Sequence, residues 1–266
     1  MPRTDVVLFY TLYTNSMPNS TTFVTERHTI RGYTIDTHSN PSNRAAIILV
    51  HGIGVSGRYF FPLAHELAKN FNVIVVNMPG SGDTIKPAEA LSILELANIL
   101  GDFMEQKNIV NATLVGHSMG CQTISMLAAQ RPELCKKLIL ISPTINSAER
   151  SASKQLFRLL QDTTREPMNV NTIIFSDYLK YGFIRYLKTQ RFMINDAIEN
   201  RVGDYPRPAL LIRGSEDSIA PELWVQQLVT CFPNATLRTV PGFAHAVHLT
   251  AHQQVATLCR SFIHDA

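Results

Sequence analysis

Short and almost uninterrupted apolar runs alternate with segments of helical periodicity along most of this chain. Four such runs lie at AAIILV (45–50), NVIVVNM (72–78), NATLVG (111–116) and KKLILISP (136–143). A strand that is apolar at nearly every position is typical of a parallel sheet that is buried on both faces. Because a helical pattern follows each of the first three runs, the sequence predicts an α/β fold with a central, mostly parallel sheet.

The remaining elements are predicted from the same periodicities and from glycine and proline breaks. The N-terminal part predicts two strands, near 22–30 and 33–38, hinged at Arg31-Gly32 and ended by NPSN at 40–43. Further along the chain the patterns predict helices near 58–70, 88–108, 118–133, 221–231 and 248–263, and strands near 207–214 and 235–242.

The strand and helix alternation stops between residues 144 and 203. This segment has no buried-strand run, leans towards helix and is rich in aromatic residues. The α/β pattern resumes after Pro206. We therefore predict one core domain, formed by residues 1–143 and 204–266, with an insertion at 144–203.

Composition excludes several classes of protein. Of the 266 residues, 45% are hydrophobic and 17% charged, with a net charge of +3 and no basic run, so nucleic acid is not an expected partner. The four cysteines are widely separated, which argues against a disulfide framework and a zinc site and favours a reducing, cytoplasmic location. The apolar run at 6–13 is short for a secretory signal, and no window reaches the roughly 20 apolar residues of a membrane span.

The segment GHSMG (116–120) stands where the third apolar run meets a helical pattern. It fits G-x-S-x-G, the turn that presents a nucleophilic serine between a strand and a helix. Glycine at both flanking positions removes side chains that would collide in so sharp a turn. We predict that the Ser118 hydroxyl is a nucleophile at a helix N-terminus, where free N–H groups favour a developing anion. The alternative is a serine in a glycine-rich connector.

A serine hydroxyl needs a base, and the base needs an acid that orients it. Asp217 and His245 each come directly after a strand predicted in the last third of the chain. The order Ser118, Asp217, His245 is the one that accompanies this turn type. We predict these three residues as a catalytic triad, with Glu216 as the alternative acid and His248 as the alternative base.

An acyl-transfer site also needs two backbone N–H donors for the oxyanion. One is expected from Met119, directly after the nucleophile, and the other from the loop LVHGIGVSG after the first apolar run. We select Ile53 for the second donor, because Gly52 and Gly54 beside it would let that backbone approach a substrate closely.

Five motifs together resemble the α/β-hydrolase fold superfamily, and in particular its small, lid-bearing, esterase-type members. They are HGIG (51–54), MPGSGDT (78–84), GHSMG (116–120), GSEDSIAP (214–221) and GFAH (242–245), in order across nearly the whole chain. The resemblance implies a sheet of about eight strands whose second strand is antiparallel. It also implies that the 144–203 insertion is a helical cap between the sixth and seventh strands.

The predicted function is hydrolysis of a small carboxylic ester or thioester through an acyl-enzyme on Ser118, without cofactor or metal. The same triad serves acyl transfer, carbon–carbon cleavage, amide or lactone opening and perhydrolysis, and a ligand receptor with a slow triad is a further alternative. Aromatic residues of the cap are candidates for the substrate pocket, because such pockets are mostly apolar. Those selected are Phe157, Tyr178, Tyr181 and Phe183.

Overall fold

The computed structural model describes residues 19–24, 28–35 and 45–264. Within these residues one sheet has the spatial strand order β1-β2-β4-β3-β5-β6-β7-β8. From β4 to β8 all neighbouring strands are parallel, whereas β2 is antiparallel to both β1 and β4. The predicted mostly parallel sheet of about eight strands with an antiparallel second strand is therefore confirmed. The strands are β1 (Asn19–Val24), β2 (Thr29–Ile35), β3 (Ala46–Val50), β4 (Asn72–Asn77), β5 (Ala112–His117), β6 (Cys135–Ile141), β7 (Ala209–Gly214) and β8 (Ala235–Val240).

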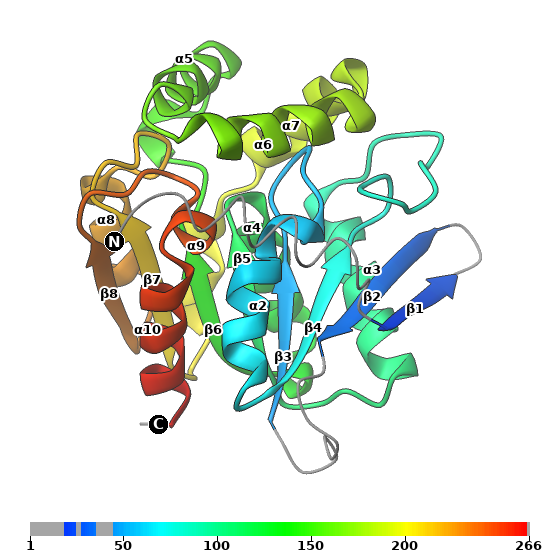
Figure 1. Ribbon diagram of the computed structural model, residues 1–266. Coiled ribbons are helices and arrows are strands. Elements are labelled where there is room, and N and C mark those ends of the chain that lie inside the picture. The colour runs from blue at the N-terminus through cyan, green and yellow to red at the C-terminus, as the bar shows by residue number, and fades with distance from the viewer. Residues whose placement is uncertain (1–18, 25–27, 36–44, 265–266) are drawn as a thin grey trace.

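Helices cover both faces of this sheet (Figure 1). One apolar cluster joins the sheet to α3, α4 and α8, and a second joins its other face to α2, α9 and α10. None of the described helices is long and apolar enough to cross a membrane. The α-helices are α2 (Phe61–Ala68), α3 (Ile93–Gln106), α4 (Met119–Gln130), α5 (Ala152–Thr163), α6 (Met168–Tyr181), α7 (Phe183–Asn195), α8 (Glu222–Thr230), α9 (Val247–Thr250) and α10 (His252–His264). Short 3-10 turns are η1 (Gly57–Phe60), η2 (Pro132–Leu134), η3 (Ser147–Glu149), η4 (Ile198–Asn200) and η5 (Val202–Asp204).

The predicted hinge at Arg31-Gly32 is wrong, because both residues lie inside the continuous strand β2. They pair with Asn77 and Val76 of β4. A Cβ atom on Gly32 would lie 2.7 Å from the ring of Phe103 in α3, so this glycine makes room for a helix rather than for a bend. The parts of the two predicted strands at 25–27 and 36–38, and the break at 40–43, lie outside the described residues.

Two predicted helices have different limits in the structure. The helix expected at 88–108 begins only after Ser92, whose hydroxyl accepts a hydrogen bond from the Glu95 N–H at 3.2 Å while the Glu95 carboxylate accepts one from the Ser92 N–H at 2.8 Å. This reciprocal cap fixes the first turn of α3. The closing helix expected at 248–263 is divided into α9 and α10, because Ala251 has φ −124° and ψ 34° and leaves the helical conformation.

The segment between β6 and β7 carries α5, α6 and α7 and forms a cap. Figure 1 shows the three helices at one end of the molecule, above the sheet and outside its two helical layers. The strands β3, β5 and β6 end beneath them, so loops at the carboxyl ends of the strands face the cap. In open α/β sheets ligands bind outside the carboxyl ends of the strands.

Candidate active site

Ser118 occupies a strained turn between β5 and α4. Its backbone has φ 54° and ψ −121°, which is far from the conformations that side chains prefer. The helix begins at once, with the Cys121 N–H bonded to the Ser118 carbonyl at 3.0 Å. A Cβ atom on Gly116 would lie 2.5 Å from the carbonyl carbon of Gly120, and one on Gly120 would lie 2.2 Å from the carbonyl oxygen of Val50. The two glycines therefore let the turn close and let α4 lie directly against β3.

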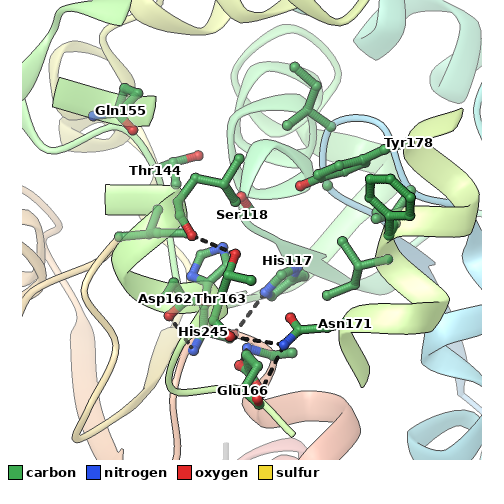
Figure 2. A pocket seen from close by; sticks show the side chains of 18 of the residues that line it. His117, Ser118, Thr144, Gln155, Asp162, Thr163, Glu166, Asn171, Tyr178 and His245 are labelled. Carbon is green, nitrogen blue, oxygen red and sulfur yellow. Dashed lines mark hydrogen bonds between the residues drawn. The ribbon is translucent and has the colours of Figure 1, made fainter. Parts of the chain in front are cut away.

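A cavity of about 540 Å³ lies between the core and the cap. Its walls bring together Ser118, His245 and Ile53 from the core. Figure 2 shows Ser118, His117 and His245 at this cavity, with polar residues of the cap around them. The cap contributes Gln155, Leu159, Leu160, Asp162, Thr163, Glu166, Met168, Asn171, Thr172, Ile174, Phe175, Tyr178, Tyr186, Gln190 and Met193.

Asp217 and His245 form a buried pair. The Nδ1 atom of His245 lies 3.1 Å from each carboxylate oxygen of Asp217. One of these oxygens also accepts hydrogen bonds from the N–H groups of Ile219 (2.9 Å) and Ala220 (2.8 Å). Burial acts to raise the pKa of Asp217, but the charge of His245 and these hydrogen bonds outweigh it and hold the pKa well below its usual range. Because Nδ1 donates to Asp217, Nε2 is the ring nitrogen left to accept a proton.

The alternative acid and base lie elsewhere. Glu216 is exposed, whereas Asp217 is buried against the imidazole. His248 is fully buried, and its ring centroid lies 4.4 Å from that of Tyr59 and 4.6 Å from that of Phe60. Burial lowers the pKa of His248 well below its usual value, and the residue does not line the cavity.

A buried hydrogen-bonded chain joins three loops of the site. The Gly52 N–H donates to the Tyr59 hydroxyl at 2.8 Å, and this hydroxyl lies 2.8 Å from Nδ1 of His117. At the other side of the ring, Nε2 of His117 lies 3.0 Å from the carbonyl oxygen of His245, which also accepts from the Ser142 hydroxyl at 3.1 Å. Since a carbonyl can only accept, Nε2 carries the proton and the Tyr59 hydroxyl donates to Nδ1.

The two predicted oxyanion donors, Ile53 and Met119, differ in their placement, because Ile53 lines the cavity and Met119 does not. Met119 is the first residue of α4, so its N–H has no acceptor within the helix. Ile53 lines the cavity beside Ser118, and the N–H of its neighbour Gly52 is already bonded to Tyr59. The Gly52 N–H is therefore not available as a donor, and Ile53 stays a prediction.

Two carboxylates of the cap reach the backbone of the loop that carries His245. Asp162 accepts from the His245 N–H at 3.2 Å, and Glu166 accepts from the Ala246 N–H at 2.6 Å. Both side chains are buried at the cavity, beside His245 in Figure 2. Burial raises the pKa of Asp162 to about 6, and burial together with the charge of Asp162 raises that of Glu166 to about 7. No sequence motif marks these residues, because only the packing of the cap brings them to the histidine.

The electrostatics of the site favour a protonated imidazole at His245. Burial on its own would lower the pKa of this histidine, but the charges of Asp217, Asp162 and Glu166 outweigh it and raise the pKa to about 9. The neighbouring ring of His117 has a pKa well below its usual value, first because of burial and then because of the charge of His245. The pair of rings therefore differs sharply in proton affinity.

Of the four aromatic residues that the sequence selected in the cap, only Tyr178 lines the cavity. Phe157 and Phe183 are 62% and 75% exposed and project from the cap, while Tyr181 is buried with its hydroxyl 2.9 Å from that of Thr189. The rotation of each cap helix about its axis decides which side chains line the cavity. The number of aromatic residues in the segment does not indicate that rotation. Among the described residues no group of three His, Cys, Asp or Glu side chains could hold a metal ion.

The chain is similar in sequence and in structure to proteins of the alpha/beta hydrolase fold. A sequence model described as the alpha/beta hydrolase fold matches residues 45–177. A protein of Mycobacterium tuberculosis that is described as uncharacterized is 36% identical over 97 residues, which is 36% of this chain but only 28% of that protein. The esterase YbfF of Escherichia coli is 25% identical over 248 residues, covering 86% of this chain and 97% of the esterase. In structure, the carboxylesterase CesB of Bacillus subtilis has a TM-score of 0.73 at 17% identity, covering 98% of this chain and 99% of that one.

We predict that Gly120→Ala destabilises the protein by about 3 kcal/mol, because the added methyl group meets the backbone oxygen of Val50 and the helix must move away. Urea unfolding measures the change. Gly203→Ala is the matched control, since its methyl group would lie 3.6 Å from the nearest atom, and a change below about 1 kcal/mol is expected there. Equal effects of the two substitutions would contradict the close approach.

We also predict that the charges of the cap raise the pKa of His245. In an NMR titration of the imidazole, the pKa of about 9 should fall by roughly one unit in Asp162→Asn and in Glu166→Gln, which keep an oxygen acceptor but remove the charge. Glu133→Gln, at an exposed position, is the control. Because the pKa of His245 is higher in the folded than in the unfolded protein, protonation of this histidine increases the free energy of unfolding. The increase is complete below pH 6.5 and is lost as the pH rises through about 9. An unchanged pKa in both variants would refute the prediction.

Proposed function

Because the chain belongs to the α/β-hydrolase fold family, whose sequence model matches half of it, we propose that it hydrolyses a carboxylic ester or thioester through an acyl-enzyme on Ser118. The observation that carries the proposal is the joint placement of the Asp217–His245 pair and the strained Ser118 at one cavity. In this proposal Ser118 is the nucleophile, His245 is the base, with Nε2 as its free nitrogen, and Asp217 is the acid that orients the base.

In the first half of the reaction Nε2 of His245 takes the proton of the Ser118 hydroxyl as the oxygen attacks the acyl carbon. Asp217 holds the imidazole in the tautomer that has its proton on Nδ1 and stabilises the positive charge that develops. The N–H groups of Ile53 and Met119 stabilise the oxyanion. His245 then protonates the leaving alcohol or thiol, which departs from the acyl-enzyme.

In the second half a water molecule gives a proton to Nε2 of His245 and attacks the acyl carbon. The bond from the acyl carbon to the Ser118 oxygen then breaks, His245 returns the proton to that oxygen, and the carboxylic acid leaves. Only the neutral imidazole can act as the base. Since the pKa of His245 is raised to about 9, kcat/KM should increase with pH through the alkaline range.

The acyl group is proposed to lie in the apolar part of the cavity, along side chains such as Leu159 and Ile174 of the cap. A volume of about 540 Å³ is within the range of pockets that enclose whole small molecules. Polar groups of the cap, among them Gln155 and Asn171, surround the rest of the cavity and suit the more polar portion of an ester.

Two of the other chemistries open to the same triad, acyl transfer and perhydrolysis, differ from hydrolysis in the molecule that attacks the acyl-enzyme. Acyl transfer uses an alcohol or thiol in place of water, and perhydrolysis uses hydrogen peroxide. Product analysis with each acceptor separates them from hydrolysis. A receptor would instead bind a ligand that raises the melting temperature and is not consumed.

We expect Ser118→Ala to reduce hydrolysis of p-nitrophenyl esters by at least about 10³-fold, because the acyl-enzyme can no longer form. The same change should remove labelling by a fluorophosphonate probe. Ser153→Ala, exposed at the start of α5, is the control and should keep both properties. Normal turnover by the Ser118 variant would exclude the proposed mechanism.

The apolar cavity also predicts a preference for chains longer than acetate. Each methylene group buried in it should raise kcat/KM about fourfold until the cavity is filled. Ile174→Trp should move the optimum to shorter chains, because the larger side chain occupies the wall of the cavity. Leu179→Trp, at a position of α6 that is 68% exposed and does not line the cavity, should leave the optimum unchanged. A preference for acetate in the wild type would contradict this placement of the acyl group.

A further inference from the structure

The exposed apolar side chains of this protein gather on its cap. Among the described residues fifteen large apolar side chains are exposed, and ten of them lie on α5, α6 and α7. Several are more exposed than not, including Met168 at 80%, Phe183 at 75% and Ile184 at 73%. Scattered exposed apolar residues are ordinary, but their concentration on one small part of a protein marks a surface that contacts something else. This outer cap surface comprises Leu156, Phe157, Leu160, Met168, Phe175, Leu179, Phe183, Ile184, Leu187 and Phe192.

The exposed charged side chains of α5, α6, α7 and the connections between them are positive. The carboxylates between residues 152 and 195 are Asp162, Glu166 and Asp177, and all three are buried. Asp162 and Glu166 face the histidine loop, and Asp177 is bound at 2.7 Å by Arg58 of the core. The basic residues of the same segment are partly or fully exposed: Lys154, Arg158, Arg165, Lys180, Arg185, Lys188 and Arg191. Carboxylates outside these three helices pair with two of the basic residues, since Arg158 lies 2.5 Å from Glu149 and Lys188 lies 2.7 Å from Glu89. Lys154, Lys180 and Arg191 remain exposed, so α5, α6 and α7 offer apolar and cationic groups to the outside and keep their own acidic groups inside.

The outer cap surface is continuous with the cavity. Leu160 of α5 and Met168 and Phe175 of α6 are exposed and also line the cavity that contains Ser118. The cap stands at one end of the molecule in Figure 1, clear of the helices that cover the sheet. Whatever lies against the outer cap surface thus lies against side chains that form the cavity wall.

We propose that the outer cap surface binds the surface of an anionic lipid bilayer. Apolar side chains interspersed with lysine and arginine are the combination by which surface helices enter the boundary between lipid head groups and acyl chains. Anionic head groups attract the basic residues, and each basic residue near the membrane strengthens the attraction. A second copy of the protein fits the surface less well, because it would bring the same positive charges together. If the proposed esterase function holds, docking also places the cavity where an ester dissolved in the bilayer can reach it.

The binding is tested by sedimentation with lipid vesicles, using full-length protein with Ser118→Ala so that no lipid is hydrolysed. Vesicles of phosphatidylcholine and phosphatidylglycerol in equimolar amounts should bind the protein, and vesicles of phosphatidylcholine alone should bind it at least about tenfold more weakly. High salt should weaken the binding to the anionic vesicles. Since binding is measured on a variant without the nucleophile, its result does not depend on the proposed chemistry.

Two pairs of matched variants assign the binding to the cap. Phe183→Ser with Ile184→Ser should lower the partition constant at least about tenfold, whereas Leu94→Ser with Leu223→Ser, at exposed apolar positions outside the cap, should not. Lys180→Glu with Arg191→Glu should weaken binding at least about tenfold, whereas Lys136→Glu with Arg238→Glu changes the net charge equally and should have a smaller effect.

Three results would overturn the proposal. The first is no binding of the parent protein to anionic vesicles. The second is binding that responds equally to the cap variants and to their matched controls. The third is a dimer in analytical ultracentrifugation that Phe183→Ser with Ile184→Ser dissociates, since the outer cap surface would then be covered by a second copy.

Discussion

The contact between the first turn of α4 and the end of β3 determines the geometry of the site. It brings the backbone at Gly120 so close to the carbonyl of Val50 that no side chain fits between them. With the helix held there, the chain must turn sharply after β5, and Ser118 is left at the tip with a positive φ angle. The strain of a single residue is thus maintained by the packing of a whole helix against the sheet.

The buried chain from Gly52 through Tyr59 and His117 to His245 extends this constraint to the other loops. Each member has a partner that suits its donor or acceptor character, so the network resists rearrangement. It crosses from the loop after β3 to the turn after β5 and then to the loop after β8. The turn that carries Ser118, the loop that carries His245 and the loop that carries Ile53 are therefore fixed relative to one another by the side chains of Tyr59 and His117.

Most of the core could be predicted from the sequence, whereas the lining of the cavity by the cap could not. Uninterrupted apolar strands and the G-x-S-x-G turn predict the sheet and Ser118, because burial on both faces and a sharp turn leave few alternatives for residue type. The chain order of Asp217 and His245 follows from the strand ends. The hinge predicted at Gly32 is wrong because, in a sequence, a glycine that makes room for an aromatic ring of another element cannot be distinguished from a glycine at a bend.

In the cap, the sequence indicates helical structure but not how the helices are rotated or which elements they contact. Of the selected aromatic residues only Tyr178 reaches the cavity, and the outward placement of Phe157 and Phe183 could not be read from periodicity. Asp162 and Glu166 would be taken for surface carboxylates in any single-sequence analysis. Their burial depends on contacts with residues about eighty positions away in the chain.

Asp162 and Glu166 connect the cap directly to the loop that carries His245. Both hydrogen bonds end on consecutive backbone N–H groups, at His245 and Ala246, so the cap holds the main chain of the loop rather than a side chain. A movement that lifted the connection between α5 and α6 away from the core would break both bonds and release the histidine backbone. The position of the cap and the position of the His245 backbone are therefore coupled through these two hydrogen bonds.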